Sequence, residues 1–171
     1  MTQAEEILPI VDLDGKVTGK DKRSAFHFKE KKLLHPVVHL HLLNSRGELF
    51  LQFRPAHKKV QPGKWDTAVG GHVSYDESVE LALEREGKEE IGVKTGNAIF
   101  LKRYLWETEI ERELVYLYYM VSDQSPVIDR SELAGGRFWT RKEILRSMSR
   151  GVFTPNLERE LEMLEEVSVW S

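Results

Sequence analysis

Alternating hydrophobic positions mark two neighbouring strands in the first half of the chain. In residues 36–43 (PVVHLHLL), Val38, Leu40 and Leu42 alternate with the residues between them, which is the two-residue period of a β-strand. Residues 48–54 (ELFLQFR) alternate in the same way. The polar turn NSRG joins the two stretches and contains a glycine, so the pattern predicts a hairpin.

A helical pattern follows over residues 77–90. Its packed face is formed by residues at three- and four-residue spacings, namely Val79, Ala82, Leu83 and Gly87. Ser74 with Glu77 three positions later has the form of a capping box, and Gly92 is placed to end the helix. Gly87 inside the helix costs about 1 kcal/mol relative to Ala, and a close contact between helix and sheet would explain it.

The rest of the chain reads as further strands, loops and helices. We expect a small hairpin over 7–12 and 16–19, an irregular or short helical segment over 20–34, strands over 98–106, 113–121 and 136–140, a loop over 122–132, and helices over 141–148 and 156–167. Strands before and after a helix, followed by C-terminal helices, predict an α/β sandwich with a mixed sheet. No repeat or linker-like tract divides the sequence, so residues 1–171 are predicted to form a single domain.

Composition excludes several classes of function. With 171 residues, 40 % hydrophobic and 31 % charged, the chain fits an ordinary globular domain. Its net charge of −3 gives no bulk attraction to a nucleic acid polymer or to an anionic membrane, although a local basic cluster can still bind a small phosphorylated ligand. The absence of cysteine excludes disulfides, thiolate metal sites and cysteine nucleophiles. Together with an N-terminus unlike a secretory signal, it predicts a cytoplasmic protein.

Three carboxylates lie on one face of the predicted helix. Glu86, Glu89 and Glu90 stand at i, i+3 and i+4 and repel each other unless a cation or water separates them. Hard divalent ions such as Mg²⁺ favour oxygen ligands and bound phosphates. A solvated acidic face is the alternative for a bare pattern of this kind.

The surrounding segment, residues 71–93, resembles the Nudix box, G-x5-E-x7-R-E-U-x-E-E-x-G-U, in which U is bulky and aliphatic. The matching positions are Gly71, Glu77, Arg85, Glu86, Glu89, Glu90, Gly92 and Val93, and Gly87 departs from the pattern. The resemblance implies a Nudix-type α/β/α sandwich with a loop–helix–loop catalytic motif. It further implies that the carbonyl of Gly70 and the glutamates Glu86, Glu89 and Glu90 hold Mg²⁺, or Mn²⁺ in its place, while Arg85 orients a glutamate and Glu77 supports the loop.

A wider stretch, from about Leu8 to about Leu145, resembles the Nudix branch that includes type I isopentenyl-diphosphate isomerase. The resemblance implies a second divalent metal site at His27, His35, His72, Glu111 and Glu113, and diphosphate binding by Arg23, Arg54 and Lys58. Structural histidines and ordinary surface charges are the alternatives. The isomerase also needs a cysteine acid/base where this chain has Gly70, and glycine cannot donate or accept a proton.

The sequence therefore predicts Mg²⁺-dependent hydrolysis of a diphosphate linkage in a small nucleotide-like substrate. An isomerase and a non-catalytic nucleotide-binding module are the alternatives, and a homodimer is left open. Loops 55–61 and 122–135 are expected to set specificity, and Glu132 is a candidate base. His39 and His41 are expected to be structural and His57 to lie on the surface. Candidates for base stacking are Trp65, Tyr104, Trp106, Tyr116 and Trp139, with Tyr104 and Trp106 sharing one sheet face.

Overall fold

The computed structural model describes residues 4–27 and 30–171. Its elements are, in chain order, β1 (Ile7–Val11), β2 (Val17–Lys22), the 3-10 helix η1 (Arg23–His27), β3 (His35–Leu43), β4 (Leu49–Phe53), β5 (Trp65–Asp66), β6 (Val69–His72), α1 (Val79–Ile91), β7 (Ile99–Glu107), β8 (Arg112–Val121), β9 (Gly135–Trp139), α2 (Arg141–Ser147) and α3 (Pro155–Glu166). Both predicted hairpins, β1–β2 and β3–β4, are present. The strands and helices expected after residue 98 also form, with small shifts at their ends.

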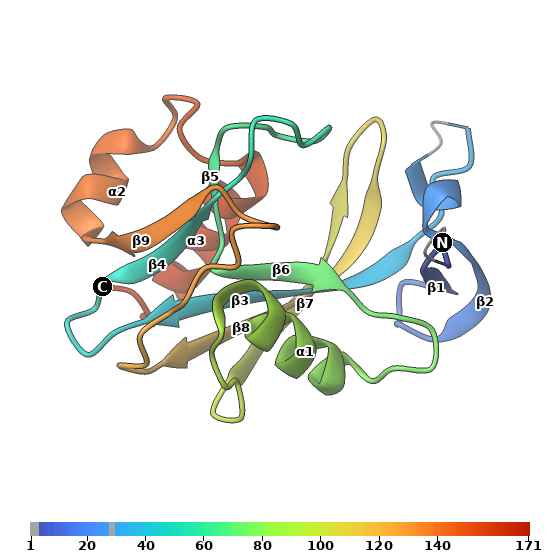
Figure 1. Cartoon of the computed structure of the whole chain (residues 1–171), viewed down its shortest axis with the longest axis horizontal. Helices are drawn as coiled ribbons and strands as arrows, with labels where there is room; N and C mark the ends of the chain where they lie inside the picture. The colour runs from blue at the N-terminus through green and yellow to red at the C-terminus, as the bar shows by residue number, and fades with distance from the viewer. Residues whose placement is uncertain (1–3, 28–29) are drawn as a thin grey trace.

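A mixed sheet with β3 at its centre organises the described residues. β3 runs parallel to β8 and antiparallel to β4 and β6, while β7 pairs with β8, and β5 and β9 pair with β4. Every residue of β3 is buried because helices cover both faces of the sheet. Figure 1 shows α1 on one side and α3 on the other. The predicted α/β/α sandwich is therefore confirmed.

The alternation along β3 decides which side chain meets which helix. Leu40 and Leu42 pack in one cluster with Ala82 and Leu83 of α1. The residues of opposite parity face α3, where Leu43 packs with Leu157, Leu161 and Leu164. His39 and His41 therefore point toward α3, away from α1.

Helix α1 begins later than predicted, and its cap is a different residue. The N-cap is Ser78, whose side chain accepts a hydrogen bond from the amide of Leu81. The side chain of Glu77 accepts from the amide of Ser74 as in a capping box, but the amide of Glu77 donates to the carbonyl of Ser74 and not to its hydroxyl. The two residues therefore form a separate turn in the loop before the helix. The prediction of a Ser74 cap was therefore wrong. Gly92 ends the helix in the left-handed conformation, as predicted (φ 64°).

Gly87 is explained by a close contact with the chain that follows the helix. A Cβ at this position would stand 2.5 Å from Cγ2 of Thr95 and 3.3 Å from the carbonyl oxygen of Val93. The carbonyl of Gly87 also accepts a hydrogen bond from the amide of Val93. The partner is therefore the helix's own C-terminal loop, whereas the sequence suggested the sheet.

Strands β5 and β6 were not predicted from the sequence. β5 has only two residues, and β6 has four, two of which are adjacent glycines. Neither strand therefore shows the alternation of hydrophobic and polar residues that predicts a strand. Pairing with β4 and β3 holds them in place. None of the helices in residues 4–27 and 30–171 combines the length and the apolar character that a bilayer crossing requires.

Candidate functional site

A cleft of about 1220 Å³ opens at one end of the sheet. Its walls come from α1 and β6, from η1, from the loop after β4, from the β7–β8 turn and from the start of α3. Among the residues lining it are all three helix glutamates, Arg85 and Gly70, together with the basic residues Arg23, Arg54 and Lys58. Segments far apart in the sequence thus place acidic and basic side chains around one space.

The glutamates of α1 occupy the acidic wall of this cleft. Glu90 is partly buried, and one of its carboxylate oxygens accepts hydrogen bonds from the amide of Gly70 (3.1 Å) and from the side chain of Gln52 (3.2 Å). Burial and the neighbouring charge of Glu86 raise the pKa of Glu90 to about 8. Burial also raises the pKa of Glu86, whereas Glu89 is exposed.

Gly71 lies so close to Glu86 that a side chain at this position would displace the Glu86 carboxylate. A Cβ on Gly71 would stand 2.1 Å from the carboxylate carbon of Glu86. The first glycine of the box therefore provides the space for this carboxylate at the edge of β6.

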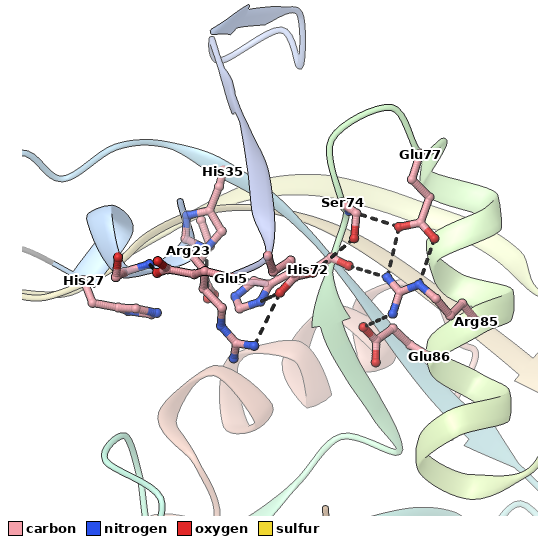
Figure 2. A network of polar contacts seen from close by, with 12 residues as sticks. Glu5, Arg23, His27, His35, His72, Ser74, Glu77, Arg85 and Glu86 are labelled. Atoms are coloured by element: carbon pink, nitrogen blue, oxygen red, sulfur yellow. Dashed lines mark hydrogen bonds and ion pairs between the residues drawn. The ribbon is translucent and has the colours of Figure 1, made fainter. Parts of the chain in front are cut away.

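Arg85 ties the loop before the helix to the carboxylates. Figure 2 shows its guanidinium between Glu77 and Glu86. It donates two hydrogen bonds to Glu77 (2.8 and 3.0 Å), one to Glu86 (2.7 Å) and one to the carbonyl of His72 (3.0 Å). Glu77 in turn accepts from the amide of Ser74. This geometry suits the orienting role expected for Arg85 and the supporting role expected for Glu77.

The donor set of the acidic wall fits a hard divalent cation. Two partly buried carboxylates with raised pKa values face the cleft next to Glu89. Their mutual repulsion is relieved by an oxygen-seeking cation, and carboxylate oxygens are the ligands that Mg²⁺ prefers.

A second cluster lies beside the first, on the side of the N-terminal hairpin. His35, His72 and Glu113 each offer a ligand atom, and these atoms lie within 4.8 Å of one another. Within the part of the chain that the structure describes, Nε2 of His35 is buried without a hydrogen-bond partner, 3.8 Å from Glu113. Burial lowers the pKa of His35 to about 4 and lowers that of His72 well below 6.5, so both imidazoles are neutral, as metal ligands must be.

The other two residues expected at this second site form a separate pair. Nδ1 of His27 lies 3.8 Å from the carboxylate of Glu111, and both line the same cleft. Three of the five expected ligands are thus gathered into one cluster, and the remaining two stand next to it. Figure 2 shows His35 and His72 next to each other, with His27 farther to the left.

The three predicted phosphate-binding residues all line the cleft, but each has a partner. Arg54 donates to the carbonyls of Val60 and Gln61 and to Asp66, so part of its guanidinium holds the loop after β4. Arg23 pairs with Glu6 at 3.4 Å. Lys58 lies 3.8 Å from Glu132, the candidate base, which also lines the cleft.

Of the five stacking candidates, only Trp106 lines the cleft. Tyr104 shares its sheet face as predicted, but it is buried and donates its hydroxyl proton to Glu160 of α3 (2.5 Å). Tyr104 is therefore not available to stack on a base in the cleft, because α3 covers the sheet at this residue. Trp65 and Trp139 pack in the hydrophobic cluster under α2 and α3, and Tyr116 packs next to Phe100.

Glu160 was missed entirely by the sequence reasoning. It is completely buried, and its carboxylate binds Nδ1 of His39, Nε2 of His41 and the hydroxyl of Tyr104. Burial opposes its ionisation, but the charge of His39 and the hydrogen bonds hold its pKa well below the usual range. Glu160 raises the pKa of His39 to about 9 against the effect of burial. A signal was present, since Glu160 interrupts the apolar stripe of α3 between Leu157 and Leu161.

Comparison with known proteins agrees with this geometry. The model of the NUDIX domain matches residues 33–159. The chain belongs to the Nudix family. It is similar to an uncharacterized Nudix hydrolase of Streptomyces coelicolor, with 30 % identity over 91 % of this chain and 86 % of the relative. It is also similar to the crystal structure of the Deinococcus radiodurans protein DR0079, with a TM-score of 0.77 and 26 % identity over 92 % and 98 % of the two chains.

The isomerase branch appears among the relatives of this Nudix protein as well. An isopentenyl-diphosphate Delta-isomerase of Corynebacterium glutamicum is 30 % identical over 105 residues, which are 61 % of this chain and 55 % of the relative. The chain spans about half the length of this isomerase and of those from a second strain of Corynebacterium glutamicum and from Corynebacterium efficiens. The kinship expected from the sequence is therefore confirmed, and so is the absence of a cysteine.

Proposed function

We propose that this Nudix protein hydrolyses a diphosphate linkage in a small nucleotide-like substrate and requires Mg²⁺. One observation carries the proposal: the same cleft is lined by three glutamates and three basic residues, namely Glu86, Glu89, Glu90, Arg23, Arg54 and Lys58. Arg85 donates hydrogen bonds to Glu86 and Glu89, and the amide of Gly70 donates one to Glu90. The acidic wall suits a cation, and the basic residues suit the phosphates that this cation accompanies.

The residues of the chain have separate tasks in this proposal. A bound divalent ion would polarise a phosphoryl oxygen and lower the pKa of the attacking water. Glu86, Glu89 and Glu90, with the carbonyl of Gly70, would hold that ion, while Arg85 and Glu77 keep the carboxylates in place. Arg23 and Lys58 would bind the non-bridging oxygens, and Trp106 offers an aromatic surface to a base. Water oxygen bonds to phosphorus, the phosphorus–bridging-oxygen bond breaks, and the two products share the protons of the water.

The test is a product assay with Mg²⁺ on nucleoside di- and triphosphates, nucleotide sugars and dinucleoside polyphosphates. We expect turnover by the wild type and a loss of at least a hundredfold in Glu90→Gln. Glu84→Gln is the matched control, because Glu84 is an exposed carboxylate on the same helix, and it should retain full activity. No turnover of any substrate, or equal turnover by Glu90→Gln, would refute the proposal.

The cluster of His35, His72 and Glu113 favours isopentenyl-diphosphate isomerisation as a second candidate, because the resemblance places a metal of the isomerase there. Gly70 argues against it, since the position supplies no acid. Incubation with isopentenyl diphosphate and chromatography of the products decides between the two. Formation of dimethylallyl diphosphate would establish the isomerase, and its absence alongside phosphate release from another substrate would exclude it. Tight nucleotide binding without turnover would indicate a binding module instead.

A further inference from the structure

Among residues 4–27 and 30–171, one side chain connects the buried carboxylate of Glu160 to the cleft. This carboxylate binds Nδ1 of His39 (2.5 Å), Nε2 of His41 (2.8 Å) and the hydroxyl of Tyr104 (2.5 Å). His41 is fully buried and Tyr104 lies under α3, but His39 lines the cleft. A charged group at the centre of this polar cluster is therefore connected to the substrate space through a single imidazole.

Stability alone does not explain a buried charged cluster of this kind. Burying a carboxylate is often neutral or unfavourable compared with apolar packing, and buried ionisable groups with a path to a cleft are more often functional. Glu160 accepts a hydrogen bond from Nδ1 of His39. This bond fixes the orientation of the imidazole ring and stabilises its doubly protonated form. Nε2 is then the free donor of the ring.

Gly70 leaves room in front of this donor. A Cβ on Gly70 would stand 3.6 Å from Nε2 of His39 and 3.5 Å from Cδ2, so a side chain here would cover the ring. Gly70 has a backbone that other residues can adopt, because it is absent from the positive-φ positions. The missing side chain therefore has a spatial effect, which is access to Nε2.

We propose that His39, held at Nδ1 by Glu160, donates a hydrogen bond from Nε2 through the gap at Gly70 to a phosphoryl oxygen of the substrate. This inference rests on the proposed function, because it assumes a diphosphate in the cleft. In this proposal His39 is a hydrogen-bond donor that binds the substrate in the cleft, and Glu160 is the residue that positions it. Besides Glu160, the acidic side chains of Asp66 and Glu113 also stabilise the positive charge on His39.

Two amide substitutions separate the two ends of the ring. His39→Asn places an amide nitrogen near the position of Nδ1, so it keeps the hydrogen bond to Glu160 but removes the Nε2 donor that faces the cleft. His39→Gln places the nitrogen near Nε2, so it keeps the donor and loses the bond to Glu160. With the substrate found in the panel, we expect kcat/KM to fall about tenfold to a hundredfold in His39→Asn. We expect a smaller loss in His39→Gln, whose thermal midpoint should fall instead.

The opposite pattern, or wild-type kinetics in His39→Asn, would overturn the inference. A measurement on the wild type does not depend on turnover or on variant folding. In protein labelled with ¹⁵N-histidine, we expect magnesium methylenediphosphonate to shift the Nε2 resonance of His39 and to leave that of His41 in place. An unmoved His39 resonance under saturating probe would overturn the inference while the hydrolytic function stood. A moved resonance without turnover of any substrate would support the inference and refute hydrolysis.

Discussion

Glu90 is expected to destabilise the metal-free protein at alkaline pH. Its pKa is about 8 in the folded chain, against 4.5 for an ordinary glutamate. Below pH 4.5 the carboxyl is protonated in both states and has no effect. As the pH rises above 4.5, the unfolded chain loses this proton while the folded chain keeps it until about pH 8. The free energy of unfolding should therefore fall across this interval and stay lower above it.

The size of the effect follows from the same two pKa values. A difference of about 3.5 between them, at about 1.4 kcal/mol for each factor of ten, sets an upper limit near 5 kcal/mol. The carboxylate is only partly buried, and water in the cleft screens it, so we expect about 2 to 3 kcal/mol.

Glu90→Gln removes the titration and keeps the local contacts. Its amide oxygen can accept the hydrogen bonds that Gly70 and Gln52 now give to the carboxylate, and its amide nitrogen then faces Glu86. In EDTA, the variant should match the wild type in urea unfolding at pH 5 and exceed it by about 2 to 3 kcal/mol at pH 8.5. Mg²⁺ should then stabilise the wild type more than the variant, since only the wild type provides the carboxylate.

Glu84→Gln controls for the loss of a negative charge from the same helix, and it should follow the wild type at both pH values. Parallel pH profiles for Glu90→Gln and the wild type would refute the reasoning, because they would mean that Glu90 ionises normally in the folded chain.

Three further substitutions test the packing of the site. Gly71→Ala should leave the protein folded by circular dichroism but lower kcat at least tenfold, since its methyl group would displace the carboxylate of Glu86; unchanged kcat would contradict this. Gly87→Ala should destabilise the protein by about 1 to 3 kcal/mol in urea unfolding through its clash with Thr95. Adding Thr95→Ser, which removes the clashing methyl, should restore most of that loss, and a lack of recovery would refute the contact. Trp106→Ala should raise KM for a nucleotide substrate severalfold with little change in kcat, whereas an equal KM would exclude stacking.

The helix glutamates, the end of the helix and the hairpin could be predicted from the sequence, because each depends on residues close together in the chain. The spacing of Glu86, Glu89 and Glu90 fixes them on one face of a helix whatever surrounds it. Gly92 ends that helix because its conformation is a local property. The β3–β4 hairpin likewise follows from alternation and a polar turn. The Nudix fold and the acidic wall were therefore predictable.

Features set by strand pairing and helix packing were decided only in three dimensions. β6 has no hydrophobic pattern, and it becomes a strand because β3 offers it hydrogen-bonding partners. Its position brings His72 beside His35, which is 37 positions earlier, and places Gly71 against Glu86.

The pair formed by His39 and Glu160 depends most clearly on the tertiary structure. His39 and Glu160 are 121 positions apart in the chain and meet only because α3 packs on the face of the sheet opposite α1. Periodicity tells that one side of α3 is buried, but it cannot tell which strand residues that side will meet. The pairing of a buried charge with its partner is a property of the assembled layers, so the sequence determined the chemistry of the helix and the tertiary structure determined what lies opposite it.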